Sequence, residues 1–168
     1  TDMSEMFRYA NAFNQPLDNW NTAKVTNMEH VFHYASSFNQ NLNRWDTSSV
    51  TRMDRMFYLA ESFDQDLDGW DTSSVLTMEE MFVAALSFDG RINTWDVSSV
   101  RDMRSLFEKA SSFNQALDAW NPKKATTMEA MFSGATFLRS EHRRVECGKG
   151  DHDARDVLQC GIVQPASQ

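Results

Sequence analysis

The sequence predicts an α/β solenoid, a right-handed coil with a parallel sheet on one face and short helices on the other. The first observation behind this fold class is a 25-residue repeat that recurs about five times without insertion or deletion. The second is that each copy combines a helix-like apolar pattern with a strand-like one. One strand and one helix cannot bury their apolar faces alone, whereas stacked copies can.

The tryptophans mark the repeat most clearly, because they follow one another at intervals of 25 residues. They are Trp20, Trp45, Trp70, Trp95 and Trp120. Methionine and phenylalanine columns keep the same step. The favoured interpretation of the tryptophan column is a packed corner, in which one large ring per turn covers its neighbour. A stacking platform for sugars or aromatic ligands is the alternative.

Two secondary-structure elements are expected in each copy. Apolar residues at i, i+3, i+4 and i+7 predict a short helix, in the second copy at Met28, Val31, Phe32 and Ala35. After it, residues 38–42 alternate between apolar and polar in the way a strand does, apart from an inward-facing glutamine. The strand would form the sheet face of the coil, and the helix would form the opposite face.

One repeat also carries a family resemblance. The string Trp-Asp-Thr-Ser-Ser-Val-Thr-x-Met-x-x-Met-Phe-x-x-Ala-x-Ser-Phe-Asp-Gln-x-Leu, from Trp45 to Leu67, closely resembles the BspA-like leucine-rich-repeat surface-protein family. The likeness covers roughly residues 1–137. It implies a leucine-rich-repeat-like coil in a secreted or cell-surface protein that mediates adhesion or protein binding. The family has no catalytic motif that could be carried over to this chain.

The sequence divides into two parts. Residues 1–137 make up the predicted repeat domain, and residues 138–168 a C-terminal cap that lacks the repeat. The chain opens in mid-repeat at Thr1, so we expect its N-terminal end to be truncated.

Both cysteines of the chain, Cys147 and Cys160, lie in the predicted cap. We expect a disulfide between them, which would close its loop and contribute about 3 kcal/mol in the entropy model. A disulfide would also indicate an oxidising compartment. A zinc site of these cysteines with His152, joined by His142, is the alternative.

The outward positions of the predicted strands form a grid of carboxylates and amides. Like charges in such a grid repel, and the sequence offers no local reason for them. A cationic partner surface or bound Ca²⁺ would compensate the charge, whereas a solvated face without a ligand is the alternative. The predicted binding residues are Asn14, Asp18, Asn39, Asn41, Asn43, Asp64, Asp66, Asp68, Asp89, Asn93, Asn114 and Asp118.

Charge and hydropathy exclude two kinds of partner. The formal net charge is −8, which argues against nucleic acid because phosphate contacts need lysine and arginine. No apolar run reaches the ~18 residues of a membrane span. We therefore expect a protein partner and no resident cofactor.

The leading functional hypothesis is a non-enzymatic protein-binding or adhesion module. A permanent structural subunit of a larger assembly is the alternative, which a wide apolar patch on the outer helices would favour. The candidate residues for such a patch are Tyr34, Tyr58, Leu59 and Val83. An enzyme is disfavoured, because His30 and His33 lack a nucleophile or carboxylate constellation and are expected to be surface histidines.

Overall fold

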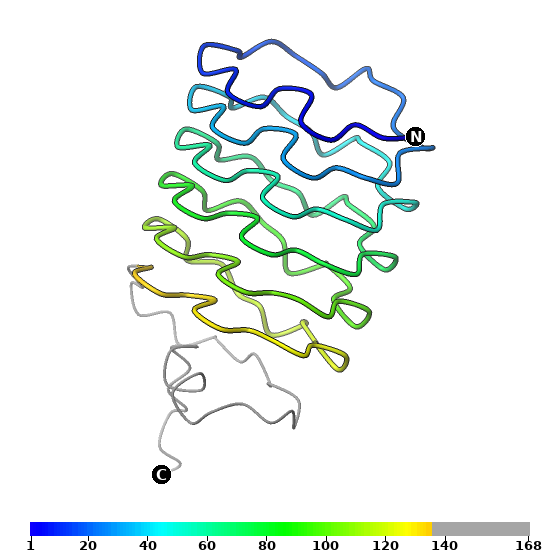
Figure 1. Cartoon of the computed structure of the whole chain (residues 1–168), viewed down its shortest axis with the longest axis vertical. Helices are drawn as coiled ribbons and strands as arrows, with labels where there is room; N and C mark the ends of the chain where they lie inside the picture. Colours follow the sequence, from blue (N-terminus) through cyan, green and yellow to red (C-terminus); the bar gives the residue numbers. More distant parts are fainter. Residues whose placement is uncertain (136–168) are drawn as a thin grey trace.

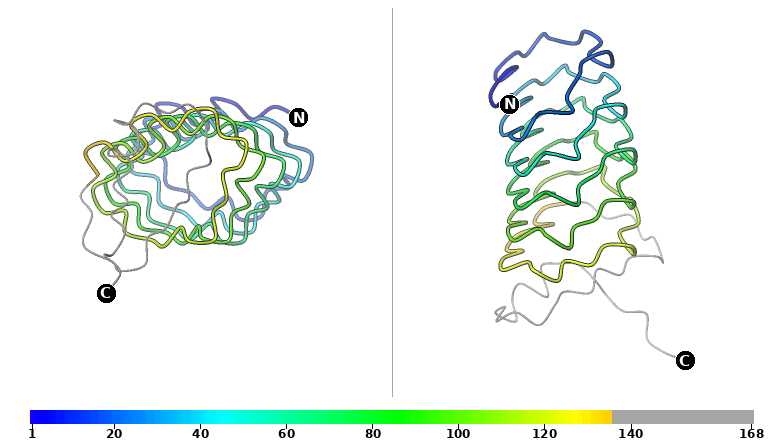
Figure 2. Two further views of the ribbon diagram at one scale, coloured as in Figure 1. Left: turned by 90° about the horizontal axis from the view of Figure 1, so that it is seen from below. Right: turned by 90° about the vertical axis from the view of Figure 1, so that its right-hand side faces the viewer.

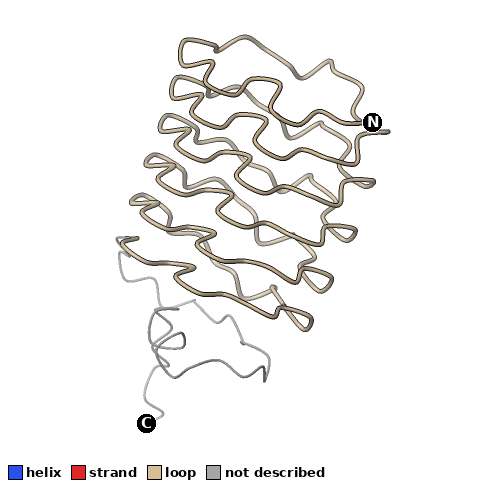
Figure 3. Ribbon diagram, viewed as in Figure 1, coloured by secondary structure: helices blue, strands red, loops and turns tan. Residues whose placement is uncertain are grey.

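The structure is a computed structural model that describes residues 1–135. This part of the chain contains no helix and no strand longer than a single bridge; turns and irregular segments make up the backbone, as Figure 3 shows. The predicted α/β solenoid of leucine-rich-repeat type, with its parallel sheet and helices, is therefore wrong. The predicted cap, with Cys147 and Cys160 and the alternative zinc ligands, lies outside the described residues.

Isolated parallel bridges join residues that are one repeat apart. They run through Asp2, Asn27, Arg52, Thr77, Asp102 and Thr127. Each repeat forms one layer, and successive layers lie side by side in Figure 1 and Figure 2. We call these layers rungs 1 to 6, at residues 2–26, 27–51, 52–76, 77–101, 102–126 and 127–135.

Tight turns replace the helix predicted at 28–35. His30 and Tyr34 have φ angles of 57° and 61°, in the left-handed region, which a right-handed helix does not contain. A helix would bond the Phe32 N–H to the Met28 carbonyl, but this N–H donates to the Met56 carbonyl of the next rung at 2.8 Å. A tight turn also brings residues i and i+3 within about 7 Å, which is why the apolar spacing resembled a helix.

Hydrogen bonds between rungs satisfy the backbone of this segment. In rung 1 the N–H groups of Met3, Glu5, Phe7 and Tyr9 donate to carbonyls 24 positions later, at 2.8–3.0 Å. The same bonds recur between every later pair of rungs up to Lys109 and Ser133. We call residues 3–10 and their equivalents the turn face.

The strand predicted at 38–42 does not pair as part of a sheet. A parallel strand would donate its N–H groups to main-chain carbonyls of a neighbour. The Asn39 N–H donates instead to the side-chain oxygen of Asn14 in the previous rung, at 2.9 Å. We call residues 14–18 and their equivalents at 39–43, 64–68, 89–93 and 114–118 the polar face.

Between the two faces lies a core of stacked aromatic rings. Phe32, Phe57, Phe82 and Phe107 are fully buried, and successive rings in this column are 5.4–5.5 Å apart. Such offset stacks bury large apolar areas in a geometry that aromatic rings prefer. The columns that the repeat predicted as core are therefore buried, although the backbone that carries them is not the predicted one.

The tryptophan column also joins rungs. The indole N–H of Trp45 donates to the Leu17 carbonyl at 3.0 Å, and that of Trp95 to the Leu67 carbonyl at 2.9 Å. Both rings are almost fully buried, at 1% and 2% exposure. This geometry supports the packed corner over a platform for ligands.

Replacing Trp95 by Phe should destabilise the chain by about 2 kcal/mol, because it leaves a cavity and removes the indole hydrogen bond to the Leu67 carbonyl, which keeps only its bond from the Trp70 N–H among the described residues. Trp20 is the matched control, since it is 41% exposed and its indole has no hydrogen bond within residues 1–135. Urea unfolding of both Trp→Phe variants measures the difference. Equal losses of unfolding free energy in the two variants would contradict a stabilising role for the indole hydrogen bond.

Candidate functional site

The polar face gathers all of the predicted binding residues on one strip. Its first column forms a ladder, in which each side-chain oxygen accepts the backbone N–H of the next rung. Asn39 thus accepts from the Asp64 N–H at 2.9 Å, and Asp64 from the Asp89 N–H at 2.9 Å. Asp89 continues to the Asn114 N–H at 2.7 Å. These side chains therefore have a structural role that the sequence did not reveal.

Most charges in the other columns of the polar face are compensated within the chain. Arg91 holds Asp66 through its guanidinium at 2.7 Å and through its backbone N–H at 2.9 Å, which lowers the pKa of this carboxyl. The Asn43 side-chain N–H donates to Asp68 at 2.9 Å. Asn93 donates in the same way to Asp118 at 2.9 Å. A basic partner is thus not needed to explain these carboxylates.

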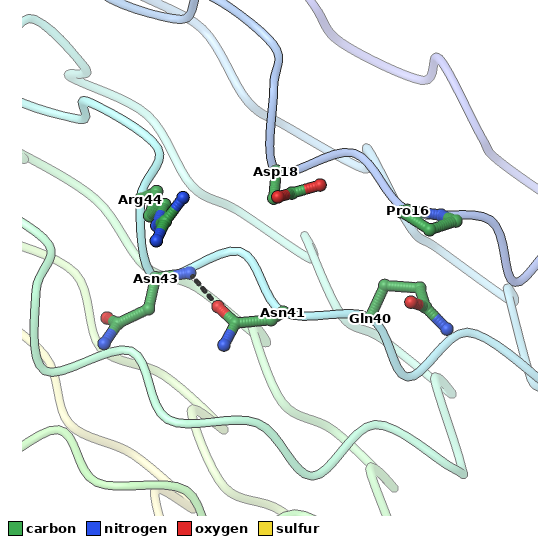
Figure 4. Close-up of a pocket in the computed structure, with 6 residues that line it drawn as sticks. All are labelled: Pro16, Asp18, Gln40, Asn41, Asn43 and Arg44. Atoms are coloured by element: carbon green, nitrogen blue, oxygen red, sulfur yellow. Dashed lines mark hydrogen bonds between the residues drawn. The ribbon is translucent and has the colours of Figure 1, made fainter.

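One hollow interrupts the polar face between rungs 1 and 2 (Figure 4). It has a volume of about 410 Å³ and is open to solvent. Its lining residues are Pro16, Asp18, Gln40, Asn41, Asn43 and Arg44. Within the described residues no group of three or more His, Cys, Asp or Glu side chains could hold a metal ion.

A second surface, on the turn face, was not recognised from the sequence. We call Tyr9, Tyr34 and Tyr58, together with His30 and His33, the tyrosine surface. The Tyr9 and Tyr34 rings are 5.1 Å apart, and the Tyr34 and Tyr58 rings are 5.8 Å apart. Tyr9 is 56% and Tyr34 38% exposed. Three rungs therefore contribute to one partly exposed aromatic ridge.

His33 lies beneath this ridge. The imidazole is stacked against Tyr58 at 4.9 Å and lies 5.0 Å from His30. It is only 6% exposed, and its Nδ1 has no hydrogen-bond partner within residues 1–135. Burial, with smaller contributions from His30 and the nearby arginines, lowers the pKa of His33 to about 4. The expectation of a surface histidine is thus wrong for His33, which is a neutral, buried side chain at pH 7.

Charged groups around the tyrosine surface pair with one another. Arg8 contacts Glu5 at 2.9 Å and lies over the Tyr9 ring. Arg55 contacts Glu80 at 2.9 Å, which lowers the pKa of this glutamate. The surface therefore presents rings and hydroxyl groups with little uncompensated charge.

Comparison with known families assigns the chain to one family. The family described as "Mycoplasma protein of unknown function, DUF285" matches residues 1–87 and, in a second match, residues 60–150. The chain belongs to the DUF285 family. Comparisons with curated proteins and with solved structures found no match. The resemblance of this DUF285 chain to the BspA-like family stays a prediction.

Within residues 1–135 of this DUF285 chain, no helix is long and apolar enough to cross a membrane.

The apolar patch that would favour a permanent structural subunit is narrower than predicted, because Val83 is only 5% exposed. The tyrosine surface could have been found in the sequence by looking for repeat positions at which the residue type differs between copies. Tyr9 and Tyr34 stand where later copies carry Leu59, Ala84 and Lys109.

The burial of His33 predicts a pH dependence of stability. An unfolded histidine has a pKa of about 6.5, so between pH 6.5 and 4 the unfolded chain binds a proton that the folded chain excludes. The free energy of unfolding should therefore fall as the pH falls through this window, on the order of 2–3 kcal/mol from His33 alone.

Carboxylates also lose stabilising contacts in acid, so the test is the difference between wild type and His33→Val. Valine is the residue that occupies the equivalent position at Val83, where it is buried. Urea unfolding from pH 7 to pH 4 should show the wild type losing more stability than the variant. If the free energy of unfolding depended on pH in the same way in both proteins, the depressed pKa of His33 would be contradicted.

Proposed function

We propose that the chain is a non-enzymatic protein-binding module that docks through the tyrosine surface. The exposure of Tyr9 and Tyr34 beside one another is the observation that carries this proposal. Tyrosine combines a large apolar ring with a hydroxyl that hydrogen-bonds, and it is enriched at the centres of protein interfaces. Contacts with neighbouring rings hold these side chains in place, which reduces the entropy lost on binding.

The backbone at these positions gives a second reason. Tyr9 and Tyr34 both have a φ of 61°, and the equivalent residue in rung 6 is Gly134, with a φ of 69°. Left-handed backbone costs a residue other than glycine about 1–2 kcal/mol. Local folding therefore does not require tyrosine at this position. A role in docking would explain why tyrosine stands there.

The charge balance around the tyrosine surface indicates the kind of partner. Arg8 and Arg55 already have carboxylate partners in the chain. The partner in this proposal is a protein with an apolar, hydrogen-bonding patch, and its affinity should depend weakly on salt. As the resemblance to the BspA-like family implies, the proposal places the module in a secreted or cell-surface protein with a role in adhesion.

The test is chemical cross-linking of the full chain in its source, followed by purification of the cross-linked protein. Affinity of the purified partner should fall at least about tenfold for Tyr34→Ala, as for a central interface tyrosine. Lys109→Ala, at the equivalent position of rung 5, is the matched control and should bind as wild type does.

Equal affinity of wild type, Tyr34→Ala and a Tyr9→Ala/Tyr34→Ala double variant would overturn the docking surface. A partner that dissociates only on denaturation would instead favour the permanent structural subunit.

A further inference from the structure

The hollow on the polar face lies where contacts between rungs are missing. In rungs 3 and 4, Asp66 and Arg91 close the corresponding gap with an ion pair of 2.7 Å. In rungs 1 and 2 the same positions hold Pro16 and Asn41. Proline has no polar side chain, so this closing contact cannot form between the first two rungs.

Several polar groups around the hollow have no partner among the residues that the structure describes. Within residues 1–135, neither Asp18 nor Arg44 has an ion pair or a side-chain hydrogen bond, and the Asn41 backbone N–H has no acceptor. Figure 4 shows Asp18 and Pro16 on one side of the hollow, with Asn41 and Gln40 opposite them.

The mixture of these groups selects a ligand class. Arg44 disfavours a bound cation, and Asp18 disfavours a bound anion. Hydroxyl groups both donate and accept, so a neutral molecule with several hydroxyls can satisfy Asp18, Arg44 and the amides together. The Pro16 ring adds an apolar surface for the C–H face of such a molecule.

We propose that this hollow is a binding site for a neutral saccharide. Its volume of about 410 Å³ is in the lower part of the range of small-molecule sites, roughly 300–1,000 Å³. The site is open and polar, so the affinity for a single sugar is in the millimolar range. It lies on a different face of the rungs from the tyrosine surface, and either site can be tested without the other.

Nuclear magnetic resonance of the full chain tests the proposal with glucose, galactose, N-acetylglucosamine and maltose as probes. Side-chain amide signals of Gln40, Asn41 and Asn43 should shift and saturate with at least one of these sugars. Inorganic phosphate and free lysine are the charged probes. No saturable shift with any sugar, or a tighter response to phosphate or lysine, would overturn the saccharide assignment.

A variant that fills the hollow locates the binding. Pro16→Asp together with Asn41→Arg copies the Asp66–Arg91 ion pair that closes the gap between rungs 3 and 4. This double variant should abolish the sugar-dependent shifts of Gln40 and Asn43. Ala116→Asp adds a carboxylate at the equivalent position of rung 5 and should leave them unchanged.

A second variant keeps the test decisive if the filled chain does not fold. Arg44→Thr installs the residue found at Thr94 and should raise the Kd for the sugar at least about tenfold, because it removes the charged donors of the hollow. Sugar-dependent shifts that persist in a folded filled variant, or an unchanged Kd in Arg44→Thr, would place the sugar elsewhere and overturn the site.

Discussion

Hydrogen bonds between rungs are the interaction on which the rest of the structure depends. Helices and sheets satisfy backbone polar groups within an element or between extended strands, and the described part of the chain contains neither. N–H groups such as that of Phe32 donate to a carbonyl one rung away, and side chains such as those of Trp95 and Asn39 add further bonds between rungs. Turn hydrogen bonds within a rung satisfy other N–H groups, such as that of Ala35. Because the bonds between rungs tie each rung to its neighbours, we expect the stack to unfold cooperatively over adjacent rungs.

This construction separates positions that hold rungs together from positions that are free to vary. Phe57 and Trp95 fill the core and recur in every complete rung. Tyr34 stands at a position where the later rungs carry other residues, and Pro16 at one where rung 3 carries Asp66. Both candidate surfaces occur at such variable positions. A stack of near-identical rungs can therefore carry different binding surfaces without a change in its backbone.

Periodicity was sufficient to predict the core, because a residue such as Phe32 must be buried in any stacked arrangement. It was not sufficient to predict the backbone. Apolar spacing cannot distinguish a helix from successive tight turns, and a tyrosine such as Tyr34 gives no indication of a left-handed φ. The asparagines and aspartates predicted to bind lie together on one strip, and their role in binding stays a prediction. The ladder of this strip was missed because a side chain such as Asp64 can face solvent and still bond the backbone of the next rung.

A pair of glycine substitutions tests most directly whether tight turns, and not helices, form the turn face. Ala84 has a φ of 51°, so Ala84→Gly should leave the free energy of unfolding unchanged or raise it by up to about 1 kcal/mol. The fully buried Ala85 has an ordinary backbone, and Ala85→Gly should lower the free energy by about 1 kcal/mol or more. Urea unfolding of the full chain gives both values. Losses of about 1 kcal/mol at both positions, as in the interior of a helix, would contradict the account.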